Sequence, residues 1–164
     1  MLRFVSYDIV FQEIPGEITL AINLSNCPYR CEGCHSPWLR ESIGQTLTED
    51  VLAALVEKYA NAITCICFMG GDASPQAVNC LAGFIKTSLV SHIKVGWYSG
   101  RCVFPSECSL QNFDYVKLGP YIERLGGLDS ETTNQRFYHI EEGRMVDSTN
   151  VFRKAKVVEV SEAS

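Results

Sequence analysis

The sequence predicts an α/β fold, a partial and open βα barrel with a mainly parallel sheet, in a single domain that covers residues 1–164. Residues 62–69 form an almost continuous apolar run, which is typical of a strand covered on both faces and so of a parallel sheet. Strand and helix patterns alternate along the chain, as in βαβ units. A full eight-fold barrel needs about 250 residues, so we expect only part of one.

The strands are expected from apolar patterns. Ile18, Leu20, Ile22 and Leu24 alternate with polar or small residues, a period of two that indicates a strand over 17–24. Further strands are predicted at 62–69, 92–98 and 113–118, with short ones at 137–140 and 145–147.

Two helices are expected between these strands. Thr46 and Glu49 match a capping box, which predicts a helix over 47–60. Ser74 as N-cap and Pro75 at the first helical position predict a second helix, whose buried stripe runs from Val78 to Leu89. The charged or small residues of 154–164 predict a frayed tail.

Composition excludes several classes of function. The net charge is −5, from 14 basic and 19 acidic residues, which argues against a nucleic-acid-binding face. No apolar run approaches the ~20 residues that span a bilayer, and residues 1–8 lack the apolar region of a secretory signal. Eight cysteines without an export signal indicate metal binding or burial rather than disulfides. We therefore expect a soluble cytoplasmic protein.

Three cysteines lie close together in the spacing C-x3-C-x2-C: Cys27, Cys31 and Cys34. Thiolates on one short loop can converge on a soft metal centre such as an iron–sulfur cluster, zinc or copper(I). A closed site usually takes four protein ligands, so three indicate an open coordination position. The alternative is a zinc knuckle completed by a distant cysteine or by His35, which we otherwise interpret as a loop residue.

Two further segments follow predicted strands directly, Gly70–Asp72 and Ser99–Gly100. In parallel sheets, ligands bind beyond the carboxyl ends of the strands. The cysteine loop and these two segments are therefore expected at one edge of the sheet.

The cysteine spacing resembles the cluster-binding signature of the radical S-adenosylmethionine (SAM) enzymes. Within that superfamily the chain is similar to the activating proteins of anaerobic (class III) ribonucleoside-triphosphate reductase, with matching segments between residues 17 and 138. These segments are 26–35, 69–72, 97–100, 119–121 and 133–136. The resemblance also implies a partial barrel.

The resemblance implies a [4Fe–4S] cluster on Cys27, Cys31 and Cys34, with the fourth iron left for SAM. Reductive cleavage of SAM would release methionine and a 5′-deoxyadenosyl radical, which would take a hydrogen atom from a glycine of the reductase. The implied partners are that reductase and a low-potential electron donor such as flavodoxin.

The resemblance also implies which residues contact SAM: Gly70, Gly71, Asp72, Ser99 and Lys117. The family usually has Gly-Gly-Glu where this chain has Gly70-Gly71-Asp72, so the carboxylate has a shorter arm. Structural alternatives are a tight turn at the glycines and a cap or turn at Ser99. Lys117 lies in a strand-like segment where a buried charge needs a partner, and we expect it to face the open side of the barrel and meet the carboxylate of SAM. The family segment that matches Asn134, Gln135 and Arg136 lies near the cofactor or the partner surface.

The remaining cysteines have simpler interpretations. Cys65 and Cys67 lie two apart in an apolar run and are expected in the core, and Cys80 fits a helix stripe. Cys102 and Cys108 are expected to be surface or partly buried thiols rather than ligands of a second metal. Alternative functions are activation of another glycyl radical enzyme, radical SAM chemistry on a small molecule, and a non-catalytic zinc or iron–sulfur module.

Overall fold

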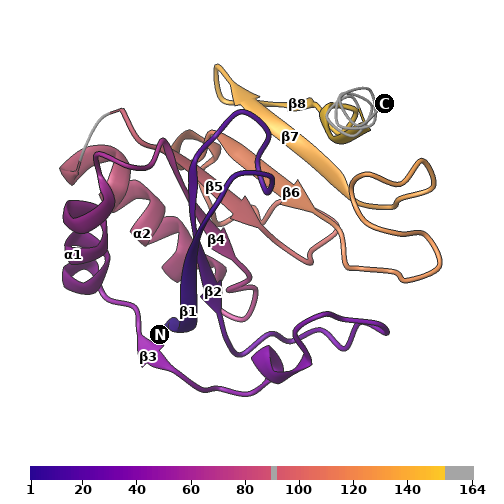
Figure 1. Ribbon diagram of the computed structural model, residues 1–164, viewed down its shortest axis with the longest axis horizontal. Coiled ribbons are helices and arrows are strands. Elements are labelled where there is room, and N and C mark those ends of the chain that lie inside the picture. The colour runs from indigo at the N-terminus through magenta and orange to yellow at the C-terminus, as the bar shows by residue number, and fades with distance from the viewer. Residues whose placement is uncertain (90–91, 154–164) are drawn as a thin grey trace, which may run out of the picture.

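The computed structural model describes residues 1–89 and 92–153. These residues form one eight-stranded sheet in the order β3-β1-β2-β4-β5-β6-β7-β8 (Figure 1). The strands are β1 (Arg3–Val10), β2 (Thr19–Leu24), β3 (Gln45–Thr46), β4 (Cys65–Met69), β5 (Lys94–Tyr98), β6 (Tyr115–Leu118), β7 (Arg136–Glu141) and β8 (Arg144–Asp147). The helices are α1 (Glu49–Tyr59) and α2 (Pro75–Ser88), with 3-10 turns at η1 (Pro37–Arg40) and η2 (Leu110–Asn112).

The predicted fold class, a partial βα barrel with a mainly parallel sheet, is wrong. In the described chain, the three pairings within β2-β4-β5-β6 are parallel. The other four, β1–β2, β1–β3, β6–β7 and β7–β8, are antiparallel. Short connections can join only antiparallel neighbours, and β1–β2 and β7–β8 are such hairpins. The result is an open mixed sheet, whose parallel part is limited to the four central strands.

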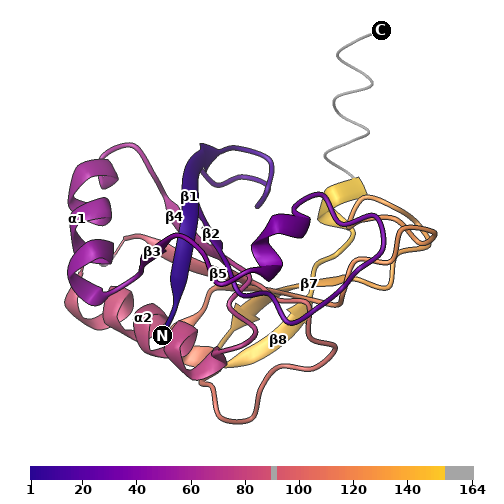
Figure 2. The ribbon, with the colours of Figure 1, turned by 90° about the horizontal axis from the view of Figure 1, so that it is seen from below.

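Helices α1 and α2 pack against the same face of the sheet (Figure 2). Helix α1 buries Leu52, Leu55 and Val56 there. Its N-cap is Thr48, whose Oγ1 accepts a hydrogen bond from the Val51 amide at 3.2 Å. The capping box predicted at Thr46 is therefore wrong, because Thr46 pairs with Arg3 in the sheet.

The main core lies between the helices and the sheet and includes the fully buried Trp97 and Phe68. A smaller cluster on the opposite face contains Cys65 and Cys67, as predicted, together with Ile14, Tyr115 and Phe137. Helix α2 begins at Pro75 after Ser74, also as predicted. Cys80, expected in the α2 stripe, is instead exposed.

No helix in the described ranges is both long enough and apolar enough to cross a bilayer. The tail predicted to fray, residues 154–164, lies outside the described residues.

Candidate functional site

The carboxyl ends of the four parallel strands lie side by side. The register places Asn23 of β2 beside Met69 of β4, Met69 beside Tyr98 of β5, and Tyr98 beside Lys117 of β6. The cysteine loop, the Gly70–Asp72 segment and the Ser99–Gly100 segment begin just beyond this row. The sequence prediction that these segments meet at one edge of the sheet is therefore confirmed.

The cysteine loop is closed at its base by backbone hydrogen bonds. The Asn26 amide donates to the Glu41 carbonyl at 3.0 Å, and the Cys27 amide donates to the Leu39 carbonyl at 2.9 Å. Between these points, the Arg40 side chain reaches across the loop and donates from Nη2 to the Cys31 carbonyl at 3.0 Å. The loop is therefore closed by two backbone hydrogen bonds, here called its stem, and is crossed by the hydrogen bond from Arg40 to Cys31, here called its brace.

The three thiols of this loop are half-buried. Burial raises the pKa of the Cys27 thiol, and negative charge on Asp72, Cys31 and Cys34 raises it further. Among the residues that the structure describes, no three His, Cys, Asp or Glu side chains form a group placed to hold a metal ion.

Asp72 ties the end of β4 to the end of β5. Its Oδ1 accepts a hydrogen bond from the Ser99 hydroxyl, and its Oδ2 accepts one from the Gly100 amide at 2.9 Å. Asp72 and Ser99 are only 4% and 0% exposed. Arg101 donates a further hydrogen bond from Nη2 to the Asp72 backbone carbonyl at 3.1 Å. Asp72 and Ser99 thus contact each other, an arrangement that the motifs did not reveal.

The two glycines before Asp72 have backbone conformations that side-chain-bearing residues rarely adopt, and Gly71 has no room for a Cβ. Gly70 and Gly71 have φ angles of +100° and +86°, in the left-handed region that favours glycine. A Cβ on Gly71 would lie 2.6 Å from Val78 Cγ2. The Trp97 indole donates from Nε1 to the Gly70 carbonyl at 2.8 Å, which fixes the turn from β5.

Lys117 lies on the face of the sheet opposite the helices and lines a pocket of about 390 Å³. Its Nζ donates to the carbonyls of Gly119 and Ser99, at 2.8 and 3.3 Å. Burial lowers the pKa of this ammonium to about 8, although nearby Asp72 and the cysteines oppose the shift. The other pocket residues are Gln12, Glu13, Tyr98, Leu128, Asp129, Gln135 and Phe152.

Glu13 brings a second ionisable group to this pocket, and burial raises the pKa of its carboxyl. Both Glu13 and Lys117 are thus shifted towards their neutral forms. The pocket is therefore a partly desolvated space in which a polar ligand would be held by few, strong contacts.

Sequence reasoning missed two residues that hold the cysteine loop, Arg40 and Tyr29. The Tyr29 ring covers Gly100 so closely that a Cβ there would lie 2.7 Å from Tyr29 Cδ2. The cysteine loop therefore packs directly on the end of β5. The sequence signals that could have indicated them were the positions of Tyr29, inside the C-x3-C-x2-C run, and of Arg40, shortly after it.

The remaining predicted residues lie around the site. His35 is exposed, with its ring 5.6 Å from the Tyr121 ring. Asn134 donates from Nδ2 to the Pro120 carbonyl at 2.9 Å, and its buried Oδ1 has no partner among the described residues. Gln135 lines the Lys117 pocket. Arg136 turns back to the carbonyls of Thr133 and Gln135.

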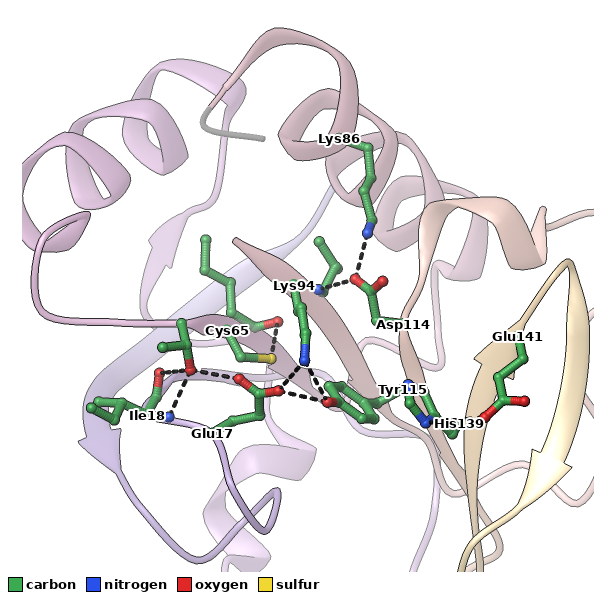
Figure 3. Close-up of polar contacts among 12 residues, drawn as sticks. Glu17, Ile18, Cys65, Lys86, Lys94, Asp114, Tyr115, His139 and Glu141 are labelled. Atoms are coloured by element: carbon green, nitrogen blue, oxygen red, sulfur yellow. Dashed lines mark hydrogen bonds and ion pairs between the residues drawn. The ribbon is translucent and has the colours of Figure 1, made fainter. Parts of the chain in front are cut away.

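A second polar cluster lies near the amino ends of the parallel strands (Figure 3). The Glu17 carboxylate accepts hydrogen bonds from Lys94, Tyr115 and Thr64, each at 2.6 Å. His139 stacks on Tyr115, with ring centroids 5.0 Å apart. Every Glu17 oxygen is satisfied within the protein, so this cluster is structural.

No protein-family model, curated protein or solved structure matches the chain. Cys27, Cys31 and Cys34 supply sulfur, the donor type that iron–sulfur clusters take, but in the described residues their side chains do not form a group placed to hold a metal. Arg40, which reaches the Cys31 carbonyl, has a buried Nε without a hydrogen-bond partner among the described residues.

Proposed function

We propose that the chain is a radical SAM activase that generates the glycyl radical of anaerobic ribonucleoside-triphosphate reductase. The observation that carries the proposal is the meeting of the three-cysteine loop with Gly70–Asp72 and Ser99–Gly100 at the carboxyl ends of the parallel strands within the mixed sheet. The proposal depends on this site and not on the fold, because function follows from the site rather than the fold.

Cys27, Cys31 and Cys34 would hold a [4Fe–4S] cluster. Such a cluster would supply the electron that cleaves the sulfonium of SAM. The backbone bonds that close the loop and the contact of Tyr29 with Gly100 hold this cysteine loop against the end of β5.

The protein's own groups suit the methionine portion of SAM. A carboxylate has about four lone-pair sites, and Asp72 uses two of them for Ser99 and Gly100. The remaining sites can accept bonds from an ammonium group. Lys117 uses two of its three N–H donors on carbonyls, so the third can bind a carboxylate.

The pocket beside Lys117, of about 390 Å³, lies within the range of small-ligand sites. The proposed final substrate is a glycine-bearing segment of the reductase, of which such a pocket would take only a few residues. We propose the cytoplasm as the compartment and a low-potential protein such as flavodoxin as the electron donor.

The decisive experiment is anaerobic reconstitution followed by incubation with SAM and dithionite. We expect about four iron and four sulfide per chain, formation of 5′-deoxyadenosine, and a glycyl radical signal on the added reductase. Cys31→Ala should abolish all three, whereas Cys80→Ala, at an exposed thiol outside the loop, should abolish none. A colourless protein that holds one zinc ion tightly would refute the proposal.

A further inference from the structure

Lys117 differs from the other lysines of the described ranges because it is both partly buried and unpaired. Lys86 and Lys94 each form an ion pair with a carboxylate, and Lys58 is exposed on α1. Within the described ranges, no carboxylate forms an ion pair with Lys117. A desolvated ammonium without a countercharge is costly, so this position favours the neutral amine more than the other three do.

The hydrogen bonds of Lys117 leave one position on its nitrogen open. Two of the three N–H positions of Nζ are directed at the backbone carbonyls of Gly119 and Ser99, at 2.8 and 3.3 Å. The remaining position carries a proton in the ammonium and a lone pair in the neutral amine. Burial lowers the pKa of Lys117 to about 8, so both forms exist near that pH. The ammonium can hold a carboxylate, as proposed above, whereas the neutral amine is a nucleophile.

The pocket beside Lys117 gives a small molecule access to this nitrogen. Its volume of about 390 Å³ is that of a small-ligand site. Leu128 and Phe152 give it apolar walls, and Glu13 and Asp129 add two carboxyl groups. The carboxyl groups disfavour an anionic ligand, and the apolar walls favour an uncharged one.

We infer that Lys117 is an aldehyde-reactive residue, which forms a protonated imine with a small, uncharged aldehyde bound in this pocket. This inference goes beyond the proposed function and requires no metal cluster. The neutral Nζ attacks the carbonyl carbon and forms the C–N bond. The carbonyl oxygen then leaves as water, with one proton from the nitrogen and one from solvent, and no electron is transferred. The N–H that remains on the imine keeps the shorter hydrogen bond, to the Gly119 carbonyl.

The surroundings of Lys117 favour a cationic product. Negative charge on Asp72 and on nearby thiols opposes the loss of the ammonium's charge, and it stabilises a positively charged imine in the same way. The ionisable groups near the nitrogen or on the pocket wall are Asp72, Cys27, Cys31, Cys67, Glu13, Tyr98 and Asp129.

The test traps the imine on the unmodified chain with benzaldehyde and sodium cyanoborohydride at about pH 8. Cyanoborohydride reduces an imine to a stable benzylamine, and mass spectrometry of the digested chain gives the labelling rate of each lysine. Lys58, exposed on α1, is the matched control within the same molecule. Parallel samples use glyoxylate, an anionic aldehyde, or contain guanidinium chloride. Circular dichroism checks that the labelled chain is folded.

We expect benzaldehyde to label Lys117 at least about tenfold faster than Lys58, because each unit by which a pKa is lowered raises the neutral fraction about tenfold. This ratio should approach one in guanidinium chloride and should be smaller with glyoxylate. Equal rates in the folded chain would overturn the inference, and so would a ratio that unfolding leaves unchanged. A larger ratio with glyoxylate would overturn the assignment of an uncharged ligand.

The labelling also separates this inference from the proposed function, because it uses the chain without iron. A reconstituted chain that does not cleave SAM refutes the proposed function and leaves the reactivity of Lys117 standing. A folded chain that cleaves SAM but labels Lys117 no faster than Lys58 refutes only this inference.

Discussion

The Lys94 ammonium lies 2.6 Å from the Glu17 carboxylate, although 77 residues separate the two in the chain. Glu17 precedes β2, and Lys94 begins β5 on the other side of β4. The Tyr115 hydroxyl, from β6, donates to the same carboxylate oxygen. One nearly buried carboxylate therefore joins three of the four parallel strands at the edge opposite the candidate site.

We predict that Glu17→Gln lowers the free energy of unfolding at pH 7 by about 1.5–3 kcal/mol, the range for hydrogen bonds to a charged group. The amide oxygen can still accept from Lys94 and Tyr115, but without the negative charge, and the amide NH2 group cannot accept the bond that Thr64 donates. Urea unfolding measures the change. Glu57→Gln, at an exposed position of α1, is the control and should change little; equal effects at the two positions would contradict the prediction.

The same carboxylate predicts a pH dependence of stability. Burial disfavours the charge on Glu17, but hydrogen bonds from Lys94, Thr64 and Tyr115 outweigh burial and lower its pKa. A carboxyl with a lowered folded-state pKa stabilises the protein above its unfolded pKa of about 4.3, and this contribution is lost as pH falls through the folded value. Unfolding at pH 7 and pH 3.5 should show a smaller drop in Glu17→Gln than in the unmodified chain.

Gly100→Ala should destabilise the protein by about 1–3 kcal/mol, as overpacking does. The new methyl group would collide with the Tyr29 ring, 2.7 Å from Cδ2. A double-mutant cycle with Tyr29→Ala isolates this contact. Gly100→Ala should lower the free energy of unfolding less in the Tyr29→Ala background than in the unmodified chain. An equal loss in both backgrounds would show that the Tyr29 ring does not cause the destabilisation.

Trp97→Phe should lower the free energy of unfolding by about 1–3 kcal/mol, because a buried carbonyl loses its hydrogen-bond donor. The carbonyl is that of Gly70, which accepts from the Trp97 indole at 2.8 Å. Trp38→Phe is the control because Trp38 is 55% exposed. Chemical denaturation of both variants gives the comparison, and similar midpoints would argue against the contact.

Thiol labelling should separate the cysteines outside the loop into two groups. Cys80 and Cys102 are exposed and should react with iodoacetamide in the native protein. Cys65 and Cys67 are fully buried, and burial raises the pKa of both thiols, so they should react only after unfolding. Mass spectrometry of the labelled peptides reads the outcome, and native labelling of Cys67 would contradict the packing of β4.

The sequence predicted the elements better than their assembly. The apolar run of β4 and the Ser74–Pro75 start of α2 are local signals, and the structure follows both. The direction of β1, β7 and β8 depends on pairing between distant or hairpin-linked segments, which periodicity does not encode. This is why the mainly parallel barrel was wrong. Thr46 failed as a cap for the same reason, since pairing with Arg3 overrode the local pattern.

In the candidate site, too, the positions of the motifs were predictable from the sequence, but the contacts between their side chains were not. The positions of the motifs followed from strand ends, which the sequence marks well. The bond between Asp72 and Ser99, and the reach of Arg40 to Cys31, depend on side-chain geometry that spacing alone does not specify. Cys80 was misplaced because it lies one residue before the buried Leu81, off the apolar face of α2.

The paired stem at Asn26 and Cys27 makes the cysteine segment a module whose two ends emerge from neighbouring points. A graft of this segment between two backbone positions with the same separation would carry its internal bonds, including the one from Arg40 to Cys31, but not the contact of Tyr29 with Gly100. Its transplantation onto an unrelated scaffold would show how much of the thiol arrangement is intrinsic to the segment and how much the underlying sheet imposes.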